Sequence, residues 1–134
     1  MEYKKSYAGF WVWLLVMCNL TLGGAFLPDM GTQILVAIID NVMTISIFVL
    51  TLMIYLNEKV YWYNGTSYEE AREAGSMRRK AFALAHMKRF GGFAAIFLLY
   101  SIVSILVGIS YWIDIVVVTA GLVIAAISTM KIKL

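Results

Sequence analysis

The sequence has few charged residues and few of the residue types that build common active sites. Only 14% of its 134 residues are charged, 62% are hydrophobic, and the mean hydropathy is +0.83. A soluble domain is usually about a quarter charged. We therefore interpret residues 1–134 as a single polytopic membrane domain.

Cysteine and histidine each occur once, as Cys18 and His86. A single cysteine excludes an intrachain disulfide and a cysteine-based metal cage. A single histidine excludes a multi-histidine metal site within one subunit. We expect no metal and no cofactor. Because no carboxylate stands at helical spacing from His86, we interpret it as a solvated or packing residue, with a proton-shuttle role as the alternative.

Proline also occurs once, as Pro28, between the first two long apolar runs. A helix needs about 20 mostly apolar residues to cross the hydrocarbon layer. The run from Phe93 to Met130 carries a single charge, Asp114, and at about 1.5 Å per residue it is nearly twice the bilayer thickness. It must therefore form two helices that reverse near Ser110–Asp114. The sequence predicts an all-α integral membrane four-helix bundle of two hairpins, with spans at about residues 10–27, 34–56, 93–110 and 112–130.

Basic residues are missing from all four predicted spans and from both short turns. The eleven Lys and Arg residues lie at Lys4 and Lys5, in the 57–90 loop, and at Lys131 and Lys133. Since positively charged residues remain on the cytoplasmic side, we predict that both termini and the loop are cytoplasmic. The predicted location is the cell membrane, as a multi-pass protein of a bacterial plasma membrane.

The predicted cytoplasmic loop contains two local folding signals. Asn64 and Gly65, flanked by aromatic residues, predict a short β-hairpin. Ser67 opens the sequence SYEE, in which Glu70 occupies the third helical position of a capping box. We expect a short helix from there through Ala74, followed by an interruption or a restart.

The second half of this loop is rich in basic residues and contains no acidic one. We predict that these residues contact anionic lipid headgroups or a partner protein on the cytoplasmic side. The alternative, which is favoured because the five bases are spread around the helix instead of gathering on one face, is that their charge only sets the topology. No recognised motif accompanies the charge, so we expect no nucleic acid partner. The residues concerned are Arg78, Arg79, Lys80, Lys88 and Arg89.

A carboxylate, Asp40, interrupts the second predicted span. An Asp at the centre of a membrane helix costs about 2.5–3.5 kcal/mol, and each Leu, Ile, Phe or Val returns roughly 0.3–0.6 kcal/mol. Ile34–Leu56 contains fourteen such residues, so the span still inserts. The four spans contain no Lys, Arg or His, so Asp40 is protonated, hydrated near the outer surface, or paired with a mobile cation or a partner chain.

Other polar residues are predicted at a depth similar to that of Asp40. Gln33, Asp40, Thr44 and Thr51 also fall in one stripe at 100° per residue, which we expect to face a bundle interior or a pore. The stripe is either interhelical hydrogen bonding or an ion-handling site. The predicted intramembrane polar cluster comprises Asn19, Thr21, Asp40, Asn41, Thr44, Ser101, Ser104 and Thr119.

The spans offer one carboxylate and no pair of groups that could activate a nucleophile, so we expect no enzyme. We predict a small scaffold, accessory subunit or immunity-type partner that packs against other membrane proteins or against copies of itself. The alternative is an oligomeric channel or transporter for ions, protons or small solutes, including holin-like permeabilisation, with the Asp40 layer lining the path.

Overall fold

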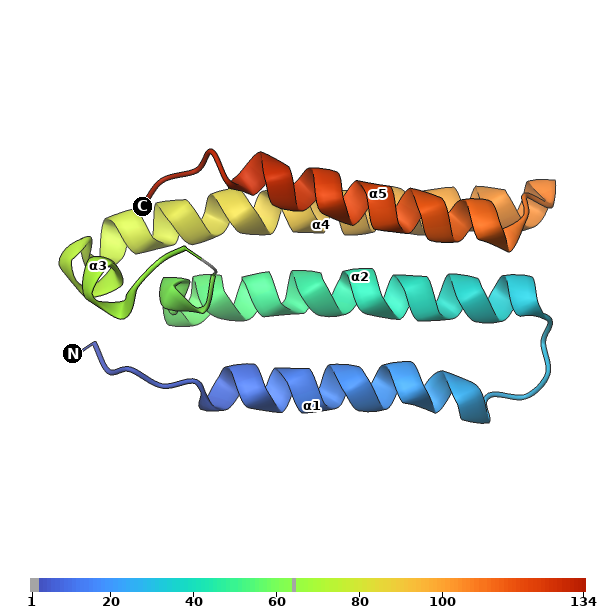
Figure 1. Cartoon of the computed structure of the whole chain (residues 1–134), viewed down its shortest axis with the longest axis horizontal. Helices are drawn as coiled ribbons and strands as arrows, with labels where there is room; N and C mark the ends of the chain where they lie inside the picture. Colours follow the sequence, from blue (N-terminus) through green and yellow to red (C-terminus); the bar gives the residue numbers. More distant parts are fainter. Residues whose placement is uncertain (1–2, 64) are drawn as a thin grey trace.

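The computed structural model describes residues 3–63 and 65–134, and its long helices lie roughly parallel to one another (Figure 1). Four helices are long and apolar enough to cross a membrane, and the described residues contain no β-strand. The predicted all-α class and the four candidate spans are confirmed. The four helices are α1 (Ala8–Gly23), α2 (Thr32–Asn57), α4 (Gly75–Val107) and α5 (Tyr111–Thr129). The short 3-10 helix η1 (Gly24–Phe26) continues α1, so the first candidate span is Ala8–Phe26.

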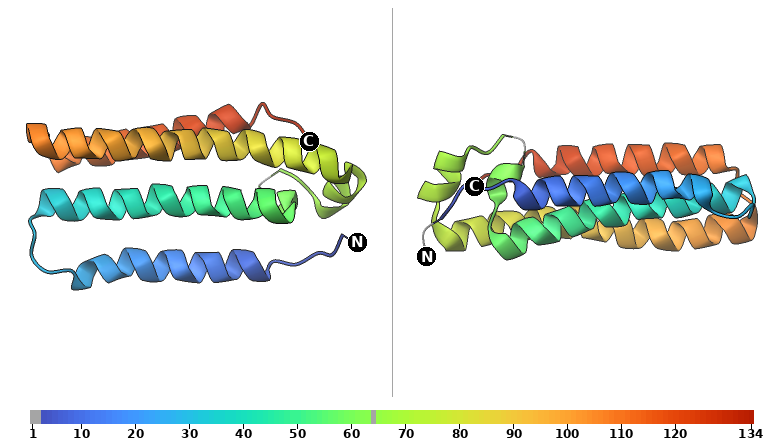
Figure 2. Two further views of the ribbon diagram at one scale, coloured as in Figure 1. Left: turned by 180° about the vertical axis from the view of Figure 1, so that it is seen from behind. Right: turned by 90° about the horizontal axis from the view of Figure 1, so that it is seen from below.

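The helix α2 occupies the middle of the molecule. It packs against α1 on one side and against α4 and α5 on the other (Figures 1 and 2). The helices α2, α4 and α5 also pack against one another pairwise, and each has several buried residues, whereas α1 has none. The two hairpins therefore form a bundle in which α1 is peripheral.

Glycines in the left-handed backbone region form the connections at one end of the bundle, which we call the turn end. Gly31 has φ +86° before α2 begins, and Gly108 has φ +74° where α4 stops. Left-handed backbone costs other residues roughly 1–2 kcal/mol. Ser110 then precedes α5. The predicted reversal falls a few residues earlier than expected, so Asp114 lies in the first turn of α5 rather than in the connection.

The opposite end, which we call the loop end, carries both chain termini and residues 57–63 and 65–74 (Figure 1). Val60–Trp62 forms a short 3-10 helix, η2, and not a β-strand. The ring of Tyr61 packs against Tyr3 and Tyr68, and Tyr3 stacks on Tyr68 at 5.5 Å. The predicted hairpin is wrong because these aromatic rings pack against the N-terminal segment. Asn64 of its predicted turn lies outside the described residues.

A capping box starts α3 (Tyr68–Glu73). Ser67 Oγ accepts a 3.1 Å hydrogen bond from the Glu70 N–H, and Glu70 Oε2 accepts a 2.8 Å bond from the Ser67 N–H. The next helix, α4, begins at Gly75, and its 33 residues measure about 50 Å at 1.5 Å per residue. Because about 20 residues cross the hydrocarbon, α4 extends beyond it and includes the second half of the predicted loop.

Candidate functional site

A buried carboxylate near the turn end connects three helices. Asp114 of α5 is only 2% exposed. Its Oδ1 accepts hydrogen bonds from Ser104 Oγ at 2.6 Å and from the Tyr100 hydroxyl at 2.9 Å, both on α4. Its Oδ2 accepts a 3.1 Å bond from Gln33 Nε2 on α2. We call Gln33, Tyr100, Ser104 and Asp114 the carboxylate cluster.

Helical spacing and the chain reversal assemble this cluster. Tyr100 and Ser104 are four residues apart and so lie on one face of α4. Gly108 ends that helix one turn later, and the reversal returns the chain so that Asp114 lies against the same face. The N-terminal N–H groups of α5 make this end of the helix positive. The site is therefore suited to a negatively charged carboxylate.

Asp40 faces the interior from α2 but has a different environment. It is 7% exposed, and its Oδ2 is buried with no hydrogen-bond partner. Thr44 and Thr51 of the predicted stripe are also buried, but their hydroxyls donate within α2, to the carbonyls of Asn41 and Phe48. Of these three stripe residues, Asp40 is thus the one with an unsatisfied side-chain atom. An unsatisfied buried polar group costs about 1–3 kcal/mol.

A second polar contact joins α2 to α4. Asn41 Nδ2 donates a 2.8 Å hydrogen bond to Ser101 Oγ and another of 2.8 Å to the Ala37 carbonyl. Ser101 in turn donates to the Phe97 carbonyl at 2.8 Å. Asn41 Oδ1 is buried without a partner. This contact holds the two helices together in the region of Asp40, and we assign it a structural role.

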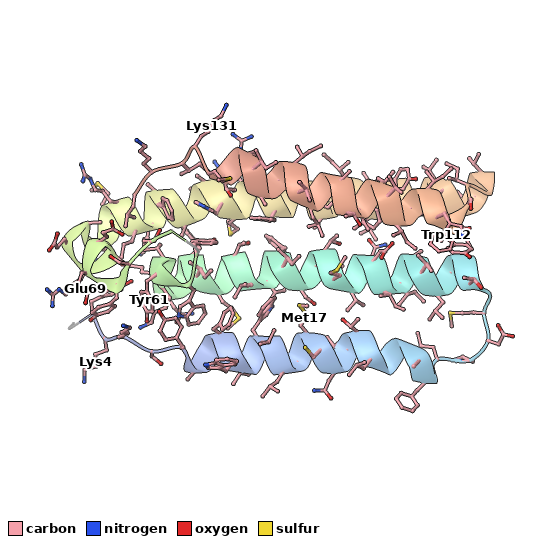
Figure 3. The ribbon with its side chains drawn as sticks, viewed as in Figure 1. Lys4, Met17, Tyr61, Glu69, Trp112 and Lys131 are labelled. Atoms are coloured by element: carbon pink, nitrogen blue, oxygen red, sulfur yellow. The ribbon has the colours of Figure 1, made fainter. Side chains whose placement is uncertain are left out.

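The two interior carboxylates have no cationic neighbour in the described part of the chain. The ion pairs found there both involve Glu58 at the loop end, with Arg79 at 2.8 Å and with Lys80 at 3.7 Å. The side-chain view places the basic residues Lys4 and Lys131 at the loop end and Trp112 at the turn end (Figure 3). The three hydrogen-bond donors to the Asp114 carboxylate are therefore all uncharged side chains.

The predicted polar residues divide into two groups. Asp40, Asn41, Thr44, Ser101 and Ser104 lie at or near the α2–α4–α5 interface. The other predicted members, Asn19, Thr21 and Thr119, lie apart from this interface. Asn19 and Thr119 are exposed. Asn19 and Thr21 donate hydrogen bonds to carbonyls of their own helix, those of Leu15 and Met17 respectively.

Sequence reasoning missed two members of the carboxylate cluster, Asp114 and Tyr100. Asp114 was placed in the reversal predicted near Ser110–Asp114 and was not included in the intramembrane polar cluster. A signal for the observed position is present, since Ser110 is a favoured helix N-cap and an acid in the next turn is typical of a helix start. Tyr100 has no comparable local signal, because only the packing of α5 brings an acid to it.

The five basic residues predicted to contact lipid or a partner differ in their exposure. Arg78, Lys80, Lys88 and Arg89 are exposed along the loop-end part of α4, whereas Arg79 is 8% exposed. Arg79 donates to Glu58 Oε2 from Nε at 3.0 Å and to the Ala71 carbonyl at 2.9 Å, and its guanidinium lies over the Tyr3 ring. Arg79 therefore joins the N-terminal segment, α2 and α3, and is not presented to lipid.

This environment shifts the pKa of Glu58. Burial raises the pKa, but hydrogen bonds from Ser76 and Arg79 and the charges of Arg79 and Lys80 together outweigh burial and hold it below its ordinary value. Burial also raises the pKa of the Tyr3 hydroxyl to about 12, so this hydroxyl remains a donor, to the Glu58 carbonyl at 2.6 Å. The loop end is thus held by a charged pair and a neutral tyrosine.

His86 is a packing residue. Its ring stacks on Tyr63 at 4.2 Å between centroids, and its Nδ1 lies 2.9 Å from the Phe82 carbonyl oxygen. It also lines an open cavity of about 580 Å³ between α3, α4 and the C-terminal segment. Acidic and basic side chains face this space together, among them Glu70, Glu73, Arg78 and Lys133, so its charge favours no single class of ligand.

Three comparisons with known proteins give no relative. The chain matches no protein-family model, no curated protein and no solved structure. Its function must therefore be argued from its own residues.

Proposed function

We propose that this protein is a non-enzymatic accessory subunit of a membrane assembly and that it binds its partner through α1. The observation that carries the proposal is the position of Asn19. Its side chain is exposed on a side of α1 that no described residue covers, in the middle of a candidate membrane span.

Depth makes the exposure of Asn19 costly. The span Ala8–Phe26 has 19 residues, so Asn19 lies two residues from its midpoint, about 3 Å along the helix axis. An amide has two N–H donors and an acceptor oxygen, and the local bond from Nδ2 to the Leu15 carbonyl uses one donor. Transfer of an unpaired amide from water to hydrocarbon costs roughly 4–8 kcal/mol. A polar group from a neighbouring helix would reduce this cost.

The surroundings of Asn19 form a continuous apolar face. At 100° per residue, Val12, Leu15, Val16 and Leu22 lie on the same side of α1 as Asn19, and all four are more than half exposed. Interhelical hydrogen bonds and close packing drive helix association in membranes. We call these five residues the α1 face and assign it to a partner helix that supplies a hydrogen-bond donor or acceptor to Asn19.

The rest of the chain holds α1 firmly enough to present this face. Trp13 Nε1 donates a 2.7 Å hydrogen bond to the Ser46 carbonyl of α2. Ser6, before α1, bonds Tyr61 through both its backbone N–H, at 2.7 Å, and its carbonyl, at 2.9 Å. A peripheral helix fixed to α2 in this way favours a scaffold role, since its free side need not rearrange on binding.

The topology we propose places the loop end in the cytoplasm. All basic residues among the described ones belong to the loop-end segments or to the start of α4, whereas the turn-end connections carry none. The positive-inside rule then orients both termini inward in the plasma membrane. The exposed bases Arg78, Lys80, Lys88 and Arg89 would meet anionic headgroups, each contributing about 1 kcal/mol near the surface.

Site-specific photo-crosslinking tests the proposal. A photoreactive amino acid at Leu15, on the α1 face, should give one discrete adduct in native membranes, and the same group at Leu106, exposed on α4, should give only lipid adducts. Asn19→Leu should abolish the Leu15 adduct, and Thr119→Leu, a matched loss of an exposed polar residue on α5, should leave it unchanged. An adduct that survives Asn19→Leu, or none at Leu15, contradicts the proposal.

Ion or proton permeation is the second candidate, and buried Asp40 with its unpartnered oxygen is the observation that favours it. A flux through reconstituted liposomes that disappears in Asp40→Asn would support permeation. Flux that is absent from both proteins would leave the accessory role as the better account.

A further inference from the structure

The buried acids Asp40 and Asp114 face the same interior from different helices, and their environments are opposite. Asp114 accepts three hydrogen bonds from neutral donors. Asp40 Oδ2 accepts none, although Asp40 is more than nine-tenths buried. Both side chains are buried where α2, α4 and α5 pack against one another.

The helices packed around α2 bring no base to this pair. The buried titratable group of α5 is Asp114. The turn-end half of α4 contributes Tyr100, whose hydroxyl donates to Asp114. The titratable side chain of α1 is Cys18, which is exposed. The short helix η1 (Gly24–Phe26) has none. His86 and the described Lys and Arg residues lie in the terminal segments, in the loop before α4, or in the loop-end half of α4.

Two negative charges without a counterion are unstable in a medium of low dielectric constant, and binding one proton removes one of them. The donors around Asp114 stabilise its negative charge, as does the N-terminus of α5. Asp40 has no such donor. From these environments we infer that Asp40, and not the hydrogen-bonded Asp114, is the reversible proton-binding site of this interior. This inference is independent of partner binding through α1.

Access for the proton is from the turn end. Gln33 and Tyr100 are partly exposed there and bond Asp114 directly. Gln33 and Asp40 are seven residues apart on α2, so they share one face at a separation of about 10.5 Å along the axis. The carboxylate cluster thus lies between the membrane surface and Asp40.

The test is covalent labelling of the full chain in liposomes with dicyclohexylcarbodiimide, which modifies protonated carboxyls in apolar surroundings. Labelled residues are identified by mass spectrometry at a series of pH values between 5 and 9. We expect modification at Asp40 that falls about tenfold per pH unit once the group titrates, and no modification at Asp114. Asp40→Asn should remove the signal. The wild-type series needs no variant, so the test does not depend on how Asp40→Asn folds.

Three results would overturn the inference. Labelling of Asp40 that is constant from pH 5 to 9 would make it a permanently neutral hydrogen-bonding group. Labelling of Asp114 in place of Asp40 would reverse the assignment. Protection of Asp40 at fixed pH by sodium chloride, but not by N-methylglucamine chloride, would identify a sodium site instead of a proton site.

Discussion

Ser104 on α4 and Asp114 on α5 are joined by a 2.6 Å hydrogen bond from the hydroxyl to the carboxylate, across the helix reversal at the turn end. Both side chains are almost fully buried. The bond fixes the position of α5 relative to α4 at the point where Gln33 of α2 also reaches the same carboxylate. One buried acid thus determines how three helices meet.

Removal of the Ser104 hydroxyl should weaken this junction. Ser104→Ala leaves Asp114 with two donors instead of three, and we expect a loss of about 1 kcal/mol in the free energy of unfolding. The measurement is equilibrium unfolding in bicelles. Ser128→Ala is the control, because Ser128 bonds only the carbonyl of Ala125 on its own helix. Equal losses in both variants would contradict the assigned role.

Substitutions of Arg79 and of Arg78 by alanine should have different effects on stability, although the two residues are adjacent in the sequence. Arg79→Ala removes one donor from Glu58 and the side-chain donor of the Ala71 carbonyl. We expect this loss to cost about 2 kcal/mol of unfolding free energy. Arg78 is exposed, so Arg78→Ala should stay within about 0.5 kcal/mol of wild type. Thermal unfolding in detergent measures both. A larger loss for Arg78→Ala would refute the packing at the loop end.

The lowered pKa of Glu58 predicts an acid-dependent stability. A carboxyl whose folded pKa is below its unfolded value stabilises the fold fully above the unfolded pKa and loses that effect as pH falls through the folded pKa. Wild type should therefore have a higher Tm than Glu58→Gln at neutral pH. The difference should disappear as the pH falls through the folded pKa of Glu58, which lies below the ordinary glutamate value.

The matched control for this pH series is Glu69→Gln, which alters an exposed acid in the first turn of α3. Its Tm should follow that of wild type over the whole range. A Tm difference between wild type and Glu58→Gln that does not depend on pH would show that Glu58 acts through packing and not through its charge.

Gly121 allows close approach of α5 to α4. A Cβ at this position would overlap the ring of Phe93, whereas a Cβ at Gly92, also helical, would meet nothing within 4 Å. We expect Gly121→Ala to cost about 1–3 kcal/mol of unfolding free energy through overpacking. Gly92→Ala should be neutral or stabilising, because alanine favours a helix by about 1 kcal/mol over glycine. Equal effects would show that α4 and α5 are not closely packed there.

The patterns that predicted correctly are those in which local composition dominates. The apolar runs predicted four candidate spans, and the stripe from Asp40 to Thr51 predicted which side of α2 faces the interior. The β-hairpin prediction around Asn64 and Gly65 failed because it considered only neighbouring residues. The ring of Tyr61 packs instead on Tyr3, far away in the sequence, and such a contact has no local signal.

The amino-acid sequence alone determined that the chain forms four apolar helices, with its basic residues gathered at one end, because hydrocarbon requires continuous helix and excludes charge. Only the tertiary structure decided which polar residues meet. It turned Asn19 outward, since α2 is the only one of the long helices on which α1 packs, and it brought Asp114 inward to Ser104, Tyr100 and Gln33. Helix periodicity specifies the face of each helix, but the choice of neighbour depends on how close the helices approach, and that is a property of the whole packed chain.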